Sequence, residues 1–583
     1  MAAAPPLVTA TAAVPATPLA VPVRSGSTAR PHRLPWFLYA TLFAAYCAAG
    51  VLVNVKIGFM FTDSMSRVAA VSGVLLSRDP HLAAIGFVFT PLTAAAQLPI
   101  AVFGEWWPGL LRWNLTAAVV SAAFMAGTVI QIRGIAWDRG CSRTLIVVLT
   151  ALFALNPMML IYAANGMSEA PFLFFVCWAV RRLIRWIRSD GVHDLITAGI
   201  ALALAYLTRY DAIAPMMVAG ALVGVVSLWR RRRIPTAYRS DPWWAAIVDA
   251  TLVIAPGVAA FGAWSFTSWL ITGEAFQQFS SVYGNSAILE QSGTRTATDV
   301  ERIAFSLTEI MVLAPALPLL LAVAAALAYR RRDGAILVPS MIFGSILGTQ
   351  SLLYLMDSTF PFLRFYITAI PFAFVLVVLL APQQIPVVSH RPGKLAVPTP
   401  DPTSVRGPSP LLAVAMSLLV GSTGVTAVAM GNERLAGLEY PVASAIMAGG
   451  RSDFDSVRNF SAERRIAQYL DNLDLPEGSV LLDTVQSFAI VTSSAKPKQF
   501  VITSDTDFVR ILDDPAAHGV QYIITVPNVK RGTADAVNRR YPTMYENGSS
   551  GVGALMLEMP NDSKAEPENW RLYRVTGQIT PGG

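Results

Sequence analysis

Apolar segments long enough to cross a lipid bilayer recur along the first 430 residues, and this pattern constrains the fold most strongly. The first of them is residues 36–55 (WFLYATLFAAYCAAGVLVNV). A helix needs about 20 apolar residues to span the hydrocarbon core of a bilayer. Only 14% of all residues are charged, against about 25% in a typical soluble domain. The chain is therefore predicted to be a polytopic α-helical membrane protein.

The basic residues indicate how these segments are oriented. Arginine runs at 181–188, 230–233 and 330–332 each follow an apolar segment, and further arginines precede the first one. Cytoplasmic loops of membrane proteins are enriched in Lys and Arg. The N-terminus and these runs are therefore predicted to be cytoplasmic. The net charge of +7 is a signal of membrane topology, and no nucleic-acid partner is expected.

An arrangement that keeps the arginine runs on one side has about eleven transmembrane helices. They are predicted at residues 36–55, 110–132, 143–162, 169–187, 194–208, 212–229, 244–270, 306–329, 335–356, 365–381 and 410–430. The apolar stretch 82–104 contains Pro91 and Pro99, and proline interrupts helices. If this stretch crossed the bilayer, every later loop would change sides. It is therefore predicted to lie at the membrane surface, among juxtamembrane helices at about 63–104.

The remaining parts of the chain differ in composition from the membrane domain, which is predicted at 35–430. Residues 1–34 are predicted to be a disordered cytoplasmic tail, and a Pro-rich cytoplasmic linker is expected at about 382–409. After residue 431, the segments SVLLD, KQFVIT and VQYIITV resemble short buried strands between helical stretches. This pattern predicts a small extracytoplasmic α/β domain at 431–583, whose polar end, 560–583, is expected to be loose.

Polar side chains gather at the predicted extracytoplasmic ends of several crossings. Ionisable groups at this depth are costly and call for a functional explanation. Asp63 follows the first crossing directly and is the candidate catalytic residue. The candidate substrate-binding residues are Arg67, His81, Glu169, Arg209, Tyr210, Asp211, Arg364 and Tyr366.

Most of these residues also have a structural explanation. Asp63 can be a solvated loop or cap residue, and Glu169 can be a charge favoured at a helix N-terminus. Arg209 and Asp211 can pair with each other and fix a tight turn. Arg364 can extend along the helix to reach the membrane surface. The sidedness of the whole set, rather than any single residue, favours a functional role.

Carboxylates and guanidiniums on one membrane face suit the transfer of a sugar from a lipid-linked phosphate. A carboxylate can accept the proton of an attacking hydroxyl group. Arginines can bind a phosphate through two parallel hydrogen bonds and stabilise its negative charge.

The order of these motifs resembles the GT-C superfamily of polyprenyl-phosphate-sugar-dependent glycosyltransferases, which includes protein-mannosyltransferase-like and aminoarabinose-transferase-like enzymes. An acidic residue lies in the first outer loop, followed by a Pro-containing stretch (GFVFTPLTAAAQLP) and by Arg112 at the next crossing. Glu169 opens a later helix, and the motifs LTRYD and RFY close two further outer loops. The resemblance covers most of residues 36–430.

This resemblance implies roles for individual residues. Asp63 would be the general base of an inverting single displacement, and Glu169 and Asp211 would organise the acceptor or the sugar. Arg209 and Arg364 would hold the donor phosphate. Many relatives carry two adjacent acids in the first loop, whereas Ser64 follows Asp63 here. No metal ligand is therefore assigned, and no cofactor is named; a divalent cation is left open without support from a paired-acid motif.

The resemblance also implies the partners and the location. The partners would be a polyprenyl-phosphate sugar donor, a glycolipid or lipoglycan acceptor, and membrane lipids. The expected donor sugar is mannose. The Arg- and Ala-rich composition suggests a high-GC bacterium such as an actinobacterium, and thus a cell-envelope mannosyltransferase of the plasma membrane. The alternatives are an arabinofuranosyl or other sugar transferase of the same fold, a lipid-linked sugar transporter or flippase, and a non-catalytic partner.

Overall fold

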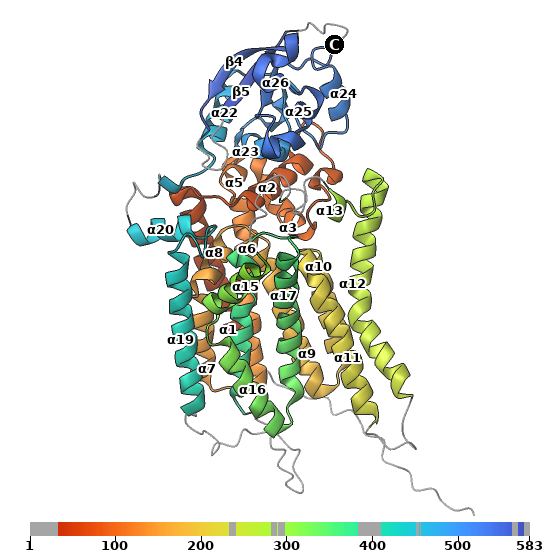
Figure 1. The fold of residues 1–583 in the computed structure, drawn as a ribbon, viewed down its shortest axis with the longest axis vertical. Coiled ribbons are helices and arrows are strands. Elements are labelled where there is room, and N and C mark those ends of the chain that lie inside the picture. Colours follow the sequence, from red (N-terminus) through yellow and green to blue (C-terminus); the bar gives the residue numbers. More distant parts are fainter. Residues whose placement is uncertain are drawn as a thin grey trace, which may run out of the picture.

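The computed structural model consists of a helical bundle, a shell of short helices over one end of it, and a small α/β domain on that shell (Figure 1). It describes residues 33–232, 241–281, 298–382, 410–449, 456–561 and 569–576, together with Leu289 and Phe454. Nearly all of the predicted N-terminal tail and of the Pro-rich linker lies outside the described residues.

Each of the eleven predicted crossings corresponds to one helix or to one bent pair of helices. They are α1 (Arg33–Val51) with η1 (Leu52–Ile57), α6 (Leu115–Arg139), α7 (Arg143–Ala154) with α8 (Pro157–Ala164), α9 (Glu169–Ser189), α10 (Val192–Tyr206), α11 (Ile213–Arg232), α12 (Pro242–Thr272), α15 (Asp299–Leu313) with α16 (Leu317–Arg331), α17 (Leu337–Leu355), α18 (Ala369–Leu380) and α19 (Pro410–Met430).

Within the described residues, seven helices are long and apolar enough to cross a membrane, or up to nine if each bent pair is one span. The pair α7 and α8 bends by 58°, and the pair α15 and α16 by 74°. The two remaining helices fall short for identifiable reasons: α9 carries four arginines and α10 has only 15 residues. Both helices pack against each other and against further helices of the bundle, so the protein is a multi-pass membrane protein.

Ion pairs and hydrogen bonds link the helix ends that carry the arginine runs. Arg139 pairs with Asp333 at 2.6 Å, and Arg181 pairs with Asp138 at 2.7 Å. Arg331 donates a hydrogen bond to the carbonyl oxygen of Leu380 at 2.9 Å. The ends of α6, α9, α16 and α18 therefore meet at one end of the bundle. The cytoplasmic location of this end stays a prediction.

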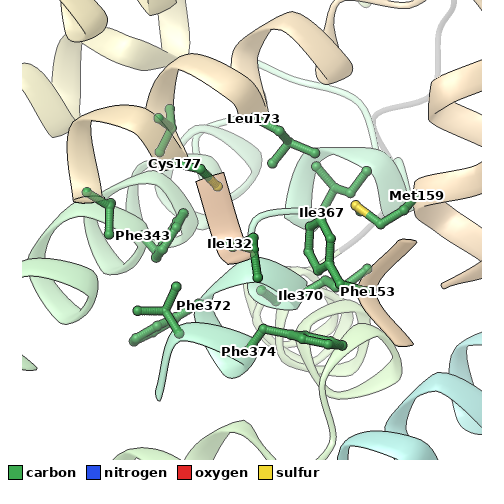
Figure 2. Packing of buried hydrophobic residues seen from close by; sticks show 14 of the residues in the cluster. Ile132, Phe153, Met159, Leu173, Cys177, Phe343, Ile367, Ile370, Phe372 and Phe374 are labelled. Atoms are coloured by element: carbon green, nitrogen blue, oxygen red, sulfur yellow. The ribbon is translucent and has the colours of Figure 1, made fainter. Parts of the chain in front are cut away.

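The centre of the bundle is α18, whose residues are all buried. Phe372 and Phe374 from this helix pack among side chains of the surrounding helices, including Phe153 of α7 and Phe343 of α17 (Figure 2). A helix that is apolar on all sides is the expected centre of a membrane bundle. The short helix η7 (Leu363–Tyr366) precedes α18 directly, so this rigid element fixes the position of Arg364.

The residues between the first two crossings form the shell of short helices over the other end of the bundle. They are α2 (Thr62–Leu75), η2 (Leu82–Ile85), α3 (Leu92–Ala95), α4 (Leu98–Ala101), η3 (Val102–Glu105) and α5 (Gly109–Arg112). Residues 82–104 thus form short pieces rather than one long helix. In Figure 1 the shell lies between the bundle and the C-terminal domain. Further short helices at loops of the bundle are η4 (Tyr210–Ala212), α13 (Gln277–Ser280) and η6 (Gly334–Ile336).

The C-terminal domain contains one five-stranded sheet in the order β2-β1-β3-β5-β4. Its strands are β1 (Val480–Leu481), β2 (Phe500–Val501), β3 (Tyr522–Thr525), β4 (Gly553–Met559) and β5 (Trp570–Val575). The first three are the predicted strands, and they are parallel to one another. The remaining helices of this domain are α22 (Ser461–Asn472), α23 (Thr484–Ser493), η9 (Pro497–Gln499), α24 (Phe508–Asp513), η10 (Lys530–Ala534), α25 (Ala536–Arg540), α26 (Met544–Asn547) and η11 (Gly548–Gly551). The preceding helix α20 (Tyr440–Ala448) packs against the bundle instead (Figure 1).

The prediction of a loose end at 560–583 is wrong for β5. This strand pairs antiparallel with both β3 and β4. Its Trp570, Leu572 and Tyr573 side chains are buried, although Arg571 lies between the first two and Arg574 follows the third. The strand covers the edge of β3, and a covered edge has no unpaired backbone groups.

Several polar contacts attach the C-terminal domain to the shell, among them two hydrogen bonds from Thr506 to the Asp79 carboxylate at 2.7 and 2.8 Å. Arg78, which follows α2, pairs with Asp505 at 3.0 Å and also with Asp507. The Asn459 side-chain amide donates to the carbonyl oxygen of Met60 at 2.7 Å, and its oxygen accepts from the Met60 N–H at 2.9 Å. A further bond joins Arg112 in α5 to the carbonyl oxygen of Ser493 at 2.8 Å.

Arg78→Ala is expected to weaken this attachment. The Asp505 side chain is fully buried, and a buried carboxylate without its partner is strongly unfavourable, so the substitution should cost roughly 3 kcal/mol of stability. Thermal unfolding in detergent and limited proteolysis between the two parts measure this. The control is Lys498→Ala, because Lys498 is exposed and 3.9 Å from Glu477. Equal melting temperatures for the two variants would contradict the expectation.

Candidate active site

Arg364 pairs with two other candidate residues, Asp63 and Glu169, which come from distant parts of the chain. Asp63 is the second residue of α2, and its carboxylate lies 2.7 Å from the Arg364 guanidinium. The same guanidinium lies 3.8 Å from the carboxylate of Glu169, the first residue of α9. Residues 301 positions apart in the chain are therefore joined by one ion pair at the end of the bundle.

Arg209 continues this row of charges on the other side of Glu169. Its guanidinium lies 2.7 Å from the Glu169 carboxylate and 2.6 Å from the carboxylate of Asp211. Asp63, Arg364, Glu169, Arg209 and Asp211 thus alternate in sign, and we call these five residues the charged cluster. Its members come from α2, η7, α9 and the turn at η4. The pairing of Arg209 with Asp211 is therefore part of a larger network.

Arg67 lies next to the cluster, one turn after Asp63 on α2. Its guanidinium donates to the backbone carbonyl oxygen of Asp63 at 3.0 Å and lies 4.6 Å from the centre of the Phe89 ring. Phe365 plays a similar role inside the cluster, since the Arg364 and Arg209 guanidiniums lie 5.0 Å and 5.3 Å from its centre. Aromatic rings attract such cations, most strongly where water is excluded.

Burial leaves two polar atoms of the cluster without a hydrogen bond. Glu169 is 1% exposed and Arg364 is 7% exposed. Glu169 Oε2 and Arg364 Nε have no hydrogen-bond partner among the described residues. Buried polar groups are nearly always paired. These atoms are therefore places where the polar groups of a ligand would be favourable.

The electrostatic surroundings keep Asp63 ionised. Burial opposes ionisation of its carboxyl group, but the nearby guanidiniums outweigh this effect, with Arg364 the strongest. Together they hold the pKa of Asp63 below its ordinary value. Asp63 is therefore a carboxylate at neutral pH and able to accept a proton, although its pairing with Arg364 reduces its basicity.

A network of amides that sequence reasoning missed holds α2 against the bundle. Ser64 donates to the side-chain oxygen of Asn114 at 2.8 Å, and the Asn114 amide nitrogen donates to Asn54 and to the Asn165 carbonyl, both at 3.0 Å. Asn54 also donates to the Ala164 carbonyl at 2.8 Å. The available signal was Asn54 itself, a polar residue inside the first apolar segment. This network fixes the start of the helix that carries Asp63.

Not all of the predicted residues face the cluster. The Tyr366 hydroxyl lies 2.8 Å from the Ser306 hydroxyl in α15, and Asp357, from the same predicted outer loop, pairs with Arg302 at 2.6 Å. The Tyr210 hydroxyl donates to the Val88 carbonyl at 2.8 Å and so ties the η4 turn to the loop after η2. The structure brings together six of the nine candidates, with Tyr210 as a support.

The last candidate, His81, lies outside the charged cluster and lines a cavity that Asp63 also lines. Its Nδ1 atom is 2.7 Å from the Asp79 carbonyl oxygen. His81 and Asp63 both line a cavity of about 560 Å³ between α2 and the C-terminal domain. Within the part of the chain that the structure describes, no group of three or more His, Cys, Asp or Glu side chains could hold a metal ion.

The overall structure is similar to that of solved membrane proteins, although the sequence matches no family model and no curated protein. One is ArnT from Cupriavidus metallidurans in the apo state, with a TM-score of 0.50 and 13% identity, covering 93% of this chain and 99% of that chain. The same protein bound to undecaprenyl phosphate gives 0.50 and 12%, with coverages of 92% and 98%.

A weaker similarity links this chain to the archaeal oligosaccharyltransferase AglB from Archaeoglobus fulgidus, in complex with an inhibitory peptide and a dolichol-phosphate. Its TM-score is 0.37 at 10% identity, covering 95% of this chain and 76% of that chain. The similarity to ArnT extends over nearly the full length of both chains. The protein is therefore a multi-pass membrane protein with the GT-C fold and a small C-terminal α/β domain.

Gly166→Ala is expected to displace α2. Gly166 has a φ of +78°, and a Cβ atom there would lie 2.2 Å from the Ser64 hydroxyl and 2.6 Å from the Ala117 Cβ. The left-handed backbone alone costs about 1 kcal/mol for alanine, and overpacking adds roughly 1–3 kcal/mol. The melting temperature in detergent should fall accordingly.

The matched control for this substitution is Gly519→Ala. Gly519 has a similar φ of +81°, but nothing lies within 4 Å of its added Cβ atom. This variant therefore carries the backbone strain without the steric clash. If both variants lost the same stability, the close packing of Gly166 against Ser64 would not be the cause.

Proposed function

We propose that this protein is a glycosyltransferase that moves a sugar from a polyprenyl-monophosphate donor to a hydroxyl group of a cell-envelope acceptor. The charged cluster is the observation that carries the proposal, because it places a carboxylate beside guanidiniums at one end of a membrane bundle. The undecaprenyl phosphate bound to ArnT, a protein with the same fold, supports a polyprenyl-phosphate donor. Arg364 and Arg209 are the proposed ligands of its phosphate.

The proposed reaction is a single displacement at the anomeric carbon of the sugar. Asp63 accepts the proton of the acceptor hydroxyl group while the oxygen of that hydroxyl group forms the new bond to the anomeric carbon. The bond from this carbon to the phosphate oxygen breaks, and the polyprenyl phosphate leaves with the electron pair. The additional negative charge develops on the phosphate, where Arg364 and Arg209 stabilise it. Glu169 and Asp211 hold these two arginines in position.

Donor binding also activates Asp63 in this proposal. In the free protein, the Arg364 guanidinium is shared between Asp63 and Glu169. A phosphate that binds Arg364 competes with the Asp63 carboxylate for its hydrogen bonds. The negative phosphate and the weaker ion pair both raise the pKa of Asp63, so the base becomes stronger once the donor is in place.

The proposed sugar is mannose, and the proposed acceptor is a cell-envelope glycolipid or lipoglycan. The family resemblance of the motifs and the Arg- and Ala-rich composition support this choice; arabinofuranose is the alternative. In the proposed orientation, the arginine runs are cytoplasmic, and the cluster and the C-terminal domain are extracytoplasmic. Transfer assays in proteoliposomes with polyprenyl-phosphomannose and polyprenyl-phosphoarabinofuranose, each with a cell-envelope lipid extract, decide between the two sugars. Movement of the donor lipid without any new glycosidic bond would support a flippase instead.

Asp63→Asn is expected to lower the rate of sugar transfer by roughly 10²–10⁴-fold, because the amide cannot accept the hydroxyl proton. Binding of the donor should be retained, since Arg364 and Arg209 remain. The assay measures formation of the glycosylated product and, separately, binding of the polyprenyl-phosphate donor. Asp357→Asn is the matched control, because the Asp357 side chain is 37% exposed, against 36% for Asp63, and pairs with Arg302 outside the cluster. Undiminished transfer by Asp63→Asn would eliminate Asp63 as the base.

Arg364→Gln is expected to change the pH dependence as well as the rate. Arg364 lowers the pKa of Asp63, so its removal raises that pKa. Protonation of Asp63 then begins at a higher pH, and the acidic limb of the kcat/KM profile moves to higher pH. The profile of the residual activity measures this shift. The control variant is Arg302→Gln, which loses a similarly buried ion pair; in this variant the acidic limb of the profile should not move. If the acidic limb also stayed in place in Arg364→Gln, Arg364 would not control the pKa of Asp63.

A further inference from the structure

The cavity next to Asp63 is bounded by two parts of the chain that are distant in sequence. Asp63 and Ser66 of α2 line one wall together with the loop that follows η2. Thr484, Thr503 and Arg531 of the C-terminal domain line the opposite wall. With a volume of about 560 Å³, the cavity lies within the size range of small-molecule binding sites.

The carboxyl ends of the parallel strands of the C-terminal sheet face this cavity. In the order β2-β1-β3, the chain passes from β1 to the neighbour on one side and then to the neighbour on the other. Parallel α/β sheets bind ligands outside the carboxyl ends of the strands at such a reversal of strand order. Thr484, Thr503 and Arg531 lie in the segments that follow β1, β2 and β3 respectively. All three line the cavity.

The arginines proposed to bind the donor phosphate lie outside this cavity. Asp63 belongs to its lining, whereas Arg67, Arg209 and Arg364 do not. Asp63 is thus the member of the charged cluster that also lines the cavity. In a displacement reaction, the base contacts the acceptor hydroxyl while the phosphate leaves from the opposite face of the sugar. The cavity therefore lies where the acceptor must bind.

The lining of the cavity is amphiphilic. The Thr484 and Thr503 hydroxyls lie 2.5 Å apart, and Ser504, which follows Thr503 in the chain, also lines the cavity. The half-buried Arg531 has no hydrogen bond or ion pair to any residue that the structure describes. Further polar side chains, such as Ser66 and Thr506, also line the cavity, and apolar side chains make up the larger part of its wall, among them Ile85, Phe87, Phe89, Ile271 and Phe488. Ile271 belongs to the last turn of α12, at one side of the bundle (Figure 1).

We infer that this cavity binds the acceptor and that the acceptor is an anionic glycolipid, whose charged group is bound by Arg531. The hydroxyl-bearing head group lies between Asp63 and the threonine pair, and the apolar wall contacts the start of the lipid chains. The inference rests on the proposed function, since it takes Asp63 as the base. It adds a role for the C-terminal domain, which selects the acceptor by its charge.

The test compares two lipids that differ at the predicted point of recognition. Phosphatidylinositol and glucosyl-diacylglycerol both carry a six-membered polyol ring on diacylglycerol, but only the first has a phosphate. Lipid binding to the full-length protein in phosphatidylcholine nanodiscs is measured by native mass spectrometry. The wild type should bind phosphatidylinositol about tenfold more tightly, since hydrogen bonds to charged groups are the stronger ones. Arg531→Gln should abolish the preference, and Arg531→Lys should retain part of it.

The control variant is Arg510→Gln, which removes a largely exposed arginine of the same domain that pairs with Asp507 at 3.6 Å. This variant should keep the wild-type preference. Inorganic phosphate should not displace phosphatidylinositol, because it cannot use the apolar wall; equal displacement would mean a site for a free anion. A wild type without preference, or an unchanged preference in Arg531→Gln, would overturn the inference.

The lipid-binding measurement tests this inference separately from the proposed sugar transfer. If the wild type transferred sugar but Arg531→Gln left both the lipid preference and the acceptor KM unchanged, only the acceptor site would be wrong. If the lipid preference followed Arg531 but no donor gave a glycosylated product, the proposed reaction would be wrong while the lipid site remained.

Discussion

The ion pairs of Arg364 hold the whole candidate site together. Its guanidinium lies between the carboxylates of Asp63 on α2 and Glu169 on α9, and the buried helix α18 follows it directly. A single buried charge of this kind would be strongly unfavourable, and a pair is stable only with good geometry and further hydrogen bonds. The alternating row that continues through Arg209 to Asp211 gives each inner charge two opposite neighbours. The site is therefore formed before any ligand binds, and in the proposed reaction the donor phosphate competes for bonds that already exist.

Rigid neighbours make this arrangement precise. Asn114 is fully buried with a φ of 54°, a conformation that is uncommon outside glycine but tolerated by asparagine. Its side chain connects the starts of α2 and α6 with the segment before α9. Gly166 in that segment leaves room for Ser64 only because it lacks a side chain. Backbone strain of this kind persists where the surrounding structure fixes it, and such positions gather at functional sites.

The sequence was sufficient to predict which residues share an end of the bundle, because arginine runs and apolar lengths carry that information. It could not predict which side chains meet. Arg364 and Tyr366 are two residues apart on η7, where three residues complete a turn, so they point in different directions. Arg364 joins the cluster and Tyr366 reaches Ser306 in α15. Hydropathy alone carries no information about side-chain direction on so short a helix. The strand β5 was missed for a related reason, since its burial depends on pairing with β3 and β4.

The two sides of Asp63 differ in how far their residues depend on one another. On the cluster side, charges from four elements depend on one another, so a change in one of them disturbs the others. On the cavity side, the C-terminal domain contributes loops at strand ends, which tolerate substitution better than the elements they connect. Arg78, Asn459 and Arg112 attach this domain to the shell through separate contacts. At the proposed acceptor site, substitutions of residues such as Arg531 are therefore expected to change the acceptor preference while the proposed donor site and base stay as they are.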